Sequence, residues 1–215
     1  MPLVVFDLDG TLIDSRRDLA DAANALIVER GGAPLPVDDI AGMVGEGAAL
    51  LVRRALAAAG LTPDSEGALP RFLDLYSDRL LVHTRAYEGV AQMIEALAQD
   101  YPLAVLTNKP LAATRAILAG LDLDSHFQWI LGGDGPLPRK PDPAALRFLI
   151  EDAGAVKDAT VMVGDSPIDL ATARAAGTRV VLAAYGFGFR PDQSNGGLVA
   201  RATSEVAVLV RQSLA

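Results

Sequence analysis

The chain has 215 residues, with 19 basic and 27 acidic side chains, a formal net charge of −8 and no cysteine. This length predicts one or two domains that fold around their own core. The lack of cysteine excludes disulfides, a thiol nucleophile and thiolate metal sites, and two histidines make a multi-histidine metal site a poor candidate. An acidic chain without basic runs argues against nucleic acid or an anionic membrane surface as a partner.

Hydrophobic residues make up 51% of the chain but come in short segments. No apolar run approaches the roughly 18 residues that a membrane helix needs. The first residues, Met1 to Phe6, lead at once into an acidic residue without a basic segment, so no secretory signal is expected. The sequence therefore predicts a soluble cytoplasmic protein with no membrane partner, and leaves monomer and homodimer both open.

Short, fully apolar, β-rich segments recur along the chain. They cover Leu3–Phe6, Leu103–Leu106, Trp129–Leu131, Thr160–Val163 and Val180–Ala184. Each is too short for a helix and apolar on both faces, which is typical of a parallel sheet covered by helices. Helical patterns fill the gaps, with Pro110 and Pro143 at expected helix starts and Gly120 and Gly177 at expected ends. The predicted core is therefore a doubly wound α/β fold with a parallel sheet.

One gap between predicted strands is too long for a doubly wound α/β fold without an insertion. A βαβ unit takes about 30 residues, yet roughly a hundred residues separate the first two predicted strands. The gap contains no convincing strand but three helical patterns, at Leu19–Arg30, Ala48–Ala59 and Leu69–Leu80. We predict an inserted helical domain over residues 15–85 and a core formed by residues 1–14 and 86–215. A polar, glycine-rich run at Asp192–Gly197 is predicted to be a surface loop.

Acidic side chains follow two of the predicted strands. Asp7 and Asp9 come directly after the first strand, and side chains at i and i+2 of an extended segment point the same way. Asp165 would lie at the tip of the strand that starts at Thr160, with Asp169 one helical turn later. Clustered carboxylates suit Mg²⁺. The alternatives are an acidic turn for the first pair and a helix cap for Asp165.

Two further motifs offer groups that can bind an anion. Thr107 and Asn108 follow the second strand at a predicted helix N-terminus, where free N–H groups attract phosphate. Lys140 stands between prolines and ahead of a helix, so a rigid backbone could hold its ammonium against an oxyanion. The alternatives are an ordinary N-cap and a solvated lysine. Because open α/β sheets bind ligands at the carboxyl ends of their strands, these motifs are predicted to form one site.

Together the four motifs, in this order, resemble those of the haloacid dehalogenase superfamily of phosphohydrolases, and the resemblance covers the whole chain. The insertion is similar to the helical cap of that superfamily's first class. Within the superfamily, phosphoglycolate phosphatases are the most similar group. That narrower resemblance is carried by the runs Asp9-Gly-Thr-Leu-Ile-Asp-Ser15, Val44-Gly-Glu-Gly47, Thr107-Asn-Lys-Pro110 and Arg139-Lys-Pro-Asp-Pro143.

The resemblance implies a Mg²⁺-dependent phosphatase for small phosphate monoesters, with 2-phosphoglycolate, converted to glycolate and phosphate, as the expected substrate. It implies that Asp7 is the nucleophile, which forms an aspartyl-phosphate, and that Asp9 is the general acid and base. Mg²⁺ would be bound by Asp7, Asp165 and the backbone carbonyl of Asp9.

The resemblance also assigns groups around these carboxylates. Thr107, Asn108 and Lys140 would hold the transferring phosphate oxygens. A second layer behind them would consist of Asp169, Ser166 and Thr11, with Asp169 orienting Lys140 or a metal-bound water. The turn of Gly45, Glu46 and Gly47 would face the active site and select the substrate, although a plain turn between helices is the alternative.

Other activities remain open at this point. A sugar phosphatase, a pyrophosphatase and a phosphomutase of the same superfamily are alternatives. Asp9 favours a phosphomonoesterase, because members that cleave carbon–halogen or carbon–phosphorus bonds lack it, and Thr11 weighs against the phosphomutase branch. A different class is a phospho-accepting signalling module, but such receiver domains are about half this length and lack a cap. His83 is predicted to be an exposed or packing histidine.

Overall fold

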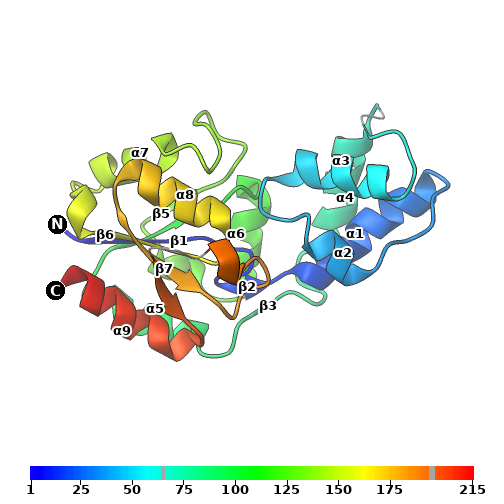
Figure 1. Ribbon diagram of the computed structural model, residues 1–215. Coiled ribbons are helices and arrows are strands. Elements are labelled where there is room, and N and C mark those ends of the chain that lie inside the picture. The colour runs from blue at the N-terminus through cyan, green and yellow to red at the C-terminus, as the bar shows by residue number, and fades with distance from the viewer. Residues whose placement is uncertain (64–65, 194–196) are drawn as a thin grey trace.

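The computed structural model describes residues 1–63, 66–193 and 197–215, and its main sheet has six parallel strands (Figure 1). The strands are β1 (Leu3–Phe6), β4 (Leu103–Leu106), β5 (Trp129–Leu131), β6 (Thr160–Gly164), β7 (Arg179–Ala183) and β8 (Leu198–Ala200). Their order is β5-β4-β1-β6-β7-β8. The strand order thus runs outward in both directions from β1. In such sheets, ligands bind at the carboxyl ends of the strands near this switch point.

Helices cover both faces of this sheet. One face is covered by α5 (Val90–Ala98), α6 (Leu111–Gly120) and α9 (Thr203–Leu214), and the other by α7 (Ala144–Asp152) and α8 (Pro167–Ala176). Successive residues of β1 point to opposite faces, so Val4 and Phe6 pack with the first set while Leu3 and Val5 pack with the second. All four are fully buried, which explains why the strand is apolar on both faces.

Local sequence fixes the ends of α8, the helix that follows the Asp165 motif. Ser166 is its N-cap and accepts a hydrogen bond from the Asp169 N–H, while the Asp169 side chain accepts one from the Ser166 N–H. Pro167 occupies the first turn, and Gly177 ends the helix with a left-handed φ of 77°. This reciprocal capping box explains why α8 begins immediately after the carboxyl end of β6.

Four further helices lie beside the carboxyl edge of the sheet (Figure 1). They are α1 (Arg16–Glu29), α2 (Val37–Ala41), α3 (Ala48–Ala58) and α4 (Ala68–Ser77). We call them the insert helices. They share an apolar cluster of their own, with Leu26, Ile27, Leu56 and Phe72 almost completely buried in it. The insert helices are therefore held to one another by apolar packing that is distinct from the packing on the sheet.

The two connections between the sheet and the insert helices run side by side. The short strands β2 (Ile13–Asp14) and β3 (Arg85–Ala86) pair in antiparallel fashion. The buried carboxylate of Asp18, in the first turn of α1, accepts hydrogen bonds from the His83 N–H, the Thr84 N–H and the Thr84 hydroxyl. The chain therefore leaves and re-enters the core at one place, where a single side chain ties both connections together.

The predicted strands and the three predicted helices of the insertion are present within a few residues. The sequence did not predict α2, the β2–β3 pair, β8 or α9. Five residues in α2 and two each in β2 and β3 are too few to show a periodicity. Of the predicted loop Asp192–Gly197, residues 192–193 belong to a short 3₁₀ turn that begins at Pro191, and residues 194–196 lie outside the described residues. No helix in the described part of the chain has the length and apolar character to cross a membrane.

Candidate active site

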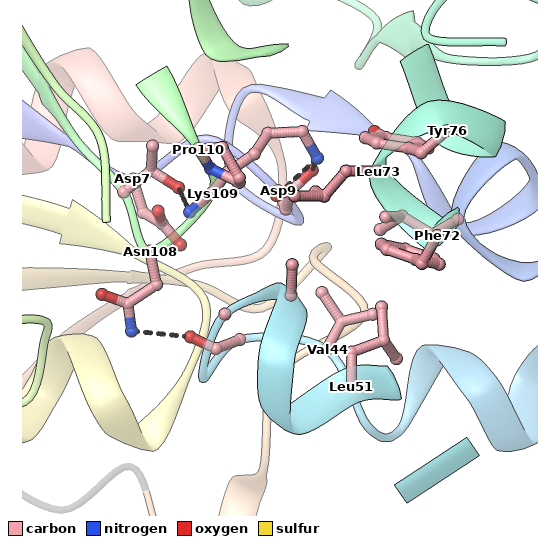
Figure 2. Close-up of a pocket in the computed structure, with 15 residues that line it drawn as sticks. Asp7, Asp9, Val44, Leu51, Phe72, Leu73, Tyr76, Asn108, Lys109 and Pro110 are labelled. Atoms are coloured by element: carbon pink, nitrogen blue, oxygen red, sulfur yellow. Dashed lines mark hydrogen bonds and ion pairs between the residues drawn. The ribbon is translucent and has the colours of Figure 1, made fainter. Parts of the chain in front are cut away.

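The carboxyl ends of β1, β4 and β6 lie side by side in the middle of the sheet. Asp7 follows β1 directly, Thr107 follows β4 and Asp165 follows β6. Between these strand ends and the insert helices lies a pocket with about 490 Å³ of empty space, including the part open to solvent (Figure 2). The residues of the predicted motifs therefore meet at one edge of the sheet, facing the insert helices.

Three carboxylates converge behind this pocket. Oxygens of Asp7, Asp165 and Asp169 lie within 4.8 Å of one another, and all three residues are buried. Lys140 brings one positive charge, with its Nζ 2.8 Å from Asp7 Oδ1 and 2.6 Å from Asp169 Oδ1. The alternative of a solvated lysine is therefore wrong, because Lys140 is buried between two carboxylates.

The negative charge of this cluster exceeds its positive charge. Burial raises the pKa of Asp7 to about 6, against the lowering effect of the adjacent Lys140. Burial also raises the pKa of Asp165 well above its usual value, and the neighbouring carboxylates of Asp169 and Asp7 add to this. Asp7 Oδ1 meets the Lys140 ammonium as its one cationic contact among the described residues. A set of oxygen donors with excess negative charge fits a hard divalent cation such as Mg²⁺.

Both oxygens of Asp169 already accept hydrogen bonds from the protein. Its Oδ1 accepts a hydrogen bond from Lys140 Nζ, and its Oδ2 accepts hydrogen bonds from the backbone N–H and the hydroxyl of Ser166. Asp169 thus caps α8 and fixes the Lys140 ammonium at the same time. The alternative in which Asp165 is the helix cap is wrong, because Ser166 is the N-cap.

Asp165 is held by groups from two distant segments. The Thr11 hydroxyl donates to Asp165 Oδ1 at 3.2 Å, and the Gly188 N–H donates to Asp165 Oδ2 at 2.7 Å. Gly186 packs so closely that a Cβ built there would lie 2.4 Å from Asp165 Cβ and 2.2 Å from the Gly10 carbonyl oxygen. No motif in the sequence predicted a role for this loop after β7. Its alternation of glycine with aromatic residues right after a strand end was the available signal.

Thr107 and Asn108 do not cap a helix. The N-cap of α6 is Pro110, and the N–H of Leu111 at the start of the helix donates to Asp134 Oδ1, so the N-cap alternative is wrong. The Asn108 side chain instead donates to the carbonyl oxygens of Gly45 and Lys140, each at 2.9 Å, and accepts a hydrogen bond from the Lys140 N–H. Its amide group therefore ties the Lys140 loop to the insert, and the backbone N–H of Asn108 is the group left for an anion.

The turn between α2 and α3 only partly matches its predicted role. Gly45 and Gly47 line the pocket. Glu46 is not among the lining residues, and its carboxylate lies 2.5 Å from Arg54 Nη2 in a half-exposed ion pair. The backbone of this turn faces the pocket, whereas the Glu46 side chain is engaged on α3. His83 is exposed on the surface, as predicted.

Asp9 has two partners that the sequence analysis did not single out. The Ser15 hydroxyl donates to Asp9 Oδ1 at 2.5 Å, and Lys109 Nζ lies 2.8 and 3.0 Å from the two Asp9 oxygens. Burial lowers the pKa of Lys109, but the neighbouring Asp9 carboxylate and Tyr76 together raise it above its usual value, so the ammonium stays charged. Lys109 belongs to the Thr107 motif and Ser15 to the Asp9 motif. Their positions in the sequence, close to residues already predicted for the site, were the only sign that they take part in it.

A family model for haloacid dehalogenase-like hydrolases matches residues 4–183. The chain belongs to this family. Within it, the chain is 44% identical over 203 residues to a phosphoglycolate phosphatase of Rhodospirillum rubrum, covering 91% of the chain and 84% of that protein. It is 38% identical to phosphoglycolate phosphatase 1 of Pseudomonas aeruginosa, covering 86% of the chain and 70% of that protein.

A solved structure agrees with this haloacid dehalogenase-like fold. A protein of Haemophilus somnus, described as a predicted phosphoglycolate phosphatase, superposes with a TM-score of 0.90 at 31% identity and covers 96% of each chain. The chain is therefore an enzyme of the hydrolase class with a haloacid dehalogenase-like core. Membership in a family of hydrolases decides against the alternative of a signalling receiver module.

Proposed function

We propose that this hydrolase is a Mg²⁺-dependent phosphatase that converts 2-phosphoglycolate to glycolate and phosphate through an aspartyl-phosphate on Asp7. The observation that carries the proposal is that Asp7 and Asp9 line one pocket, while Lys140 and Asp165 lie directly beside Asp7. The names of relatives that are 44% and 38% identical to the chain support the choice of substrate.

In the first half-reaction, a carboxylate oxygen of Asp7 attacks phosphorus and the bond to the leaving oxygen breaks. Asp9 gives a proton to that oxygen, so glycolate leaves as an alcohol. In the second half-reaction, Asp9 takes a proton from water, and this water attacks phosphorus and breaks the bond to Asp7. Two easier steps replace one difficult step, and Asp9 ends with the proton that it lost.

The remaining groups of the site hold charge. Mg²⁺ would be bound by Asp7, Asp165 and the backbone carbonyl of Asp9. Its positive charge would reduce the repulsion between the anionic nucleophile and the anionic substrate. Lys140 would contact the transferring oxygens together with Thr107 and the Asn108 N–H. Its ammonium is already fixed by Asp169, so little reorganisation is needed when substrate binds.

Residues 15–85 are proposed to be a cap domain, with residues 1–14 and 86–215 as the catalytic core. The two connections at Asp14–Ser15 and Thr84–Ala86 lie together, which suits a hinge. The insert helices face the pocket with apolar side chains such as Leu51 and Phe72. Closure of such a lid would exclude water from the chamber and leave room for a small leaving group only.

A panel of phosphate monoesters tests the proposal. We expect the highest kcat/KM for 2-phosphoglycolate, by about tenfold or more over sugar phosphates, nucleotides and pyrophosphate, because one extra or missing interaction changes kcat/KM by 10- to 200-fold. Initial rates with Mg²⁺ give the comparison. If a sugar phosphate or pyrophosphate is the best substrate, the narrow assignment is wrong. Conversion of a sugar phosphate to its isomer would indicate a phosphomutase.

Gly186→Ala is expected to weaken Mg²⁺ binding about 10- to 100-fold, the usual effect of disturbing groups that position a metal ligand. The added Cβ would meet Asp165 at 2.4 Å and force that carboxylate to move. The Mg²⁺ concentration for half-maximal activity measures the effect. Gly135→Ala is the matched control, because its added Cβ meets only the Gly132 carbonyl oxygen at 3.6 Å. An unchanged Mg²⁺ requirement in Gly186→Ala would contradict the assignment of Asp165.

A further inference from the structure

Lys109 is the only cationic side chain among the described residues that line the pocket. Its side chain is 3% exposed, and its Nζ lies 2.8 Å from Asp9 Oδ1 and 4.7 Å from the centre of the Tyr76 ring. Asp9 belongs to the sheet and Tyr76 to α4 of the insert. The ammonium therefore lies between the reaction centre and the insert helices, where a leaving group would extend from the phosphate (Figure 2).

Tyr76 adds a second polar group at this place. Its hydroxyl is buried beside the Lys109 ammonium, which can only donate to it, and the hydroxyl proton has no acceptor among the described residues. Figure 2 shows this oxygen at the end of the ring that is nearer to Lys109. A buried hydroxyl proton without an acceptor costs free energy, and such groups in native proteins call for an explanation. A ligand that accepts a hydrogen bond in the pocket would supply the missing partner.

Among the described residues, the rest of the wall on the insert side offers no polar side chain. It is formed by Leu19, Val44, Leu51, Phe72 and Leu73. Among such residues an unpaired carboxylate would be strongly destabilised, whereas a lysine ammonium and a hydroxyl donor would bind it well. Lys140, 2.8 Å from Asp7, is already proposed to contact the phosphate. Lys109 is thus available to the other end of the substrate.

We propose that Lys109 and the Tyr76 hydroxyl form the subsite that binds a carboxylate on the leaving group and selects anionic over uncharged small phosphate esters. This inference rests on the proposed phosphatase function. In the ligand-free protein, Asp9 takes the place of the substrate carboxylate at Lys109. Because Tyr76 belongs to α4, a substrate carboxylate in the subsite would also join the insert to the core.

The test compares 2-phosphoglycolate with its uncharged analogue carbamoylmethyl phosphate, in which an amide replaces the carboxylate. We expect the wild-type enzyme to prefer 2-phosphoglycolate. Lys109→Met should reduce the ratio of the two kcat/KM values by about 30-fold or more, the scale of losing a charged partner in a buried site. Tyr76→Phe should reduce the same ratio by about three- to tenfold, the scale of one hydrogen bond, because it removes only the hydroxyl and keeps the ring that stacks on Phe72.

Two further variants make the result specific. Lys109→Arg keeps the charge and should restore part of the ratio, while Lys157→Met, at an exposed lysine far along the chain, should leave both substrates unaffected. Losses of equal size on both substrates in Lys109→Met and Tyr76→Phe would overturn the subsite. A wild-type enzyme that hydrolyses the two esters equally well would also overturn it and leave the phosphatase intact. Failure to hydrolyse either ester would instead overturn the proposed function.

Discussion

Asp7→Asn is expected to abolish both turnover and the formation of a covalent phosphoenzyme. An amide oxygen is a poor nucleophile, and the substitution also removes one of the carboxylates proposed to bind Mg²⁺. The loss should approach the limit of detection, since the nucleophile and the metal site fail together. Rapid quenching after mixing with a labelled phosphate ester, followed by detection of the phosphorylated protein, measures the intermediate directly.

Asp9→Asn serves as the comparison. Its carboxylate is proposed to move protons and not to form a bond to phosphorus, so both half-reactions should slow by about 10²–10⁴-fold, the usual contribution of general acid–base catalysis. Labelled phosphate should still appear on the protein in this variant. Label on the protein in Asp7→Asn would show that another group is the nucleophile.

Removal of divalent cations with EDTA is expected to reduce the hydrolysis of an aryl phosphate by at least about 100-fold, and added Mg²⁺ should restore it. Three buried carboxylates, Asp7, Asp165 and Asp169, face a single ammonium from Lys140, so without a cation the site repels an anionic ester. A metal supplies several kcal/mol of charge stabilisation, and each 1.36 kcal/mol corresponds to a factor of ten in rate.

An aryl phosphate is the right probe for this experiment because it does not depend on the carboxylate subsite at Lys109. The circular dichroism spectrum in EDTA should match that of the Mg²⁺-loaded enzyme, since the core is held by apolar packing on both faces of the sheet. Full activity in the presence of the chelator would refute the proposed mechanism.

The sequence by itself determined the fold class and most of the site. Strands such as Leu3–Phe6 are apolar on both faces because helices cover both sides of the sheet, and this pattern is visible without any structure. Asp7 and Asp165 could be chosen because each directly follows such a strand. The gap after the first strand is too long for one crossover helix, and its apolar residues recur with the spacing of helices. These two observations predicted a helical insertion.

Only the tertiary structure decided which partner each polar side chain has. Asn108, a candidate for phosphate binding, uses its side chain to connect the Lys140 loop with Gly45. Glu46, a candidate for substrate selection, pairs with Arg54. These contacts join residues whose distance along the chain carries no periodic signal, so no local pattern predicts them.

The contacts of Lys109 and Gly186 are the clearest examples of contacts that no local sequence pattern predicts. Lys109 meets Tyr76 only because α4 of the insert lies against the carboxyl end of β4, and Gly186 meets Asp165 only because the loop after β7 folds back over β6. Strand and helix patterns arise from repeated burial of neighbouring residues, which the sequence records. The selectivity of a pocket arises from single contacts between distant segments, and these exist only after the chain has folded.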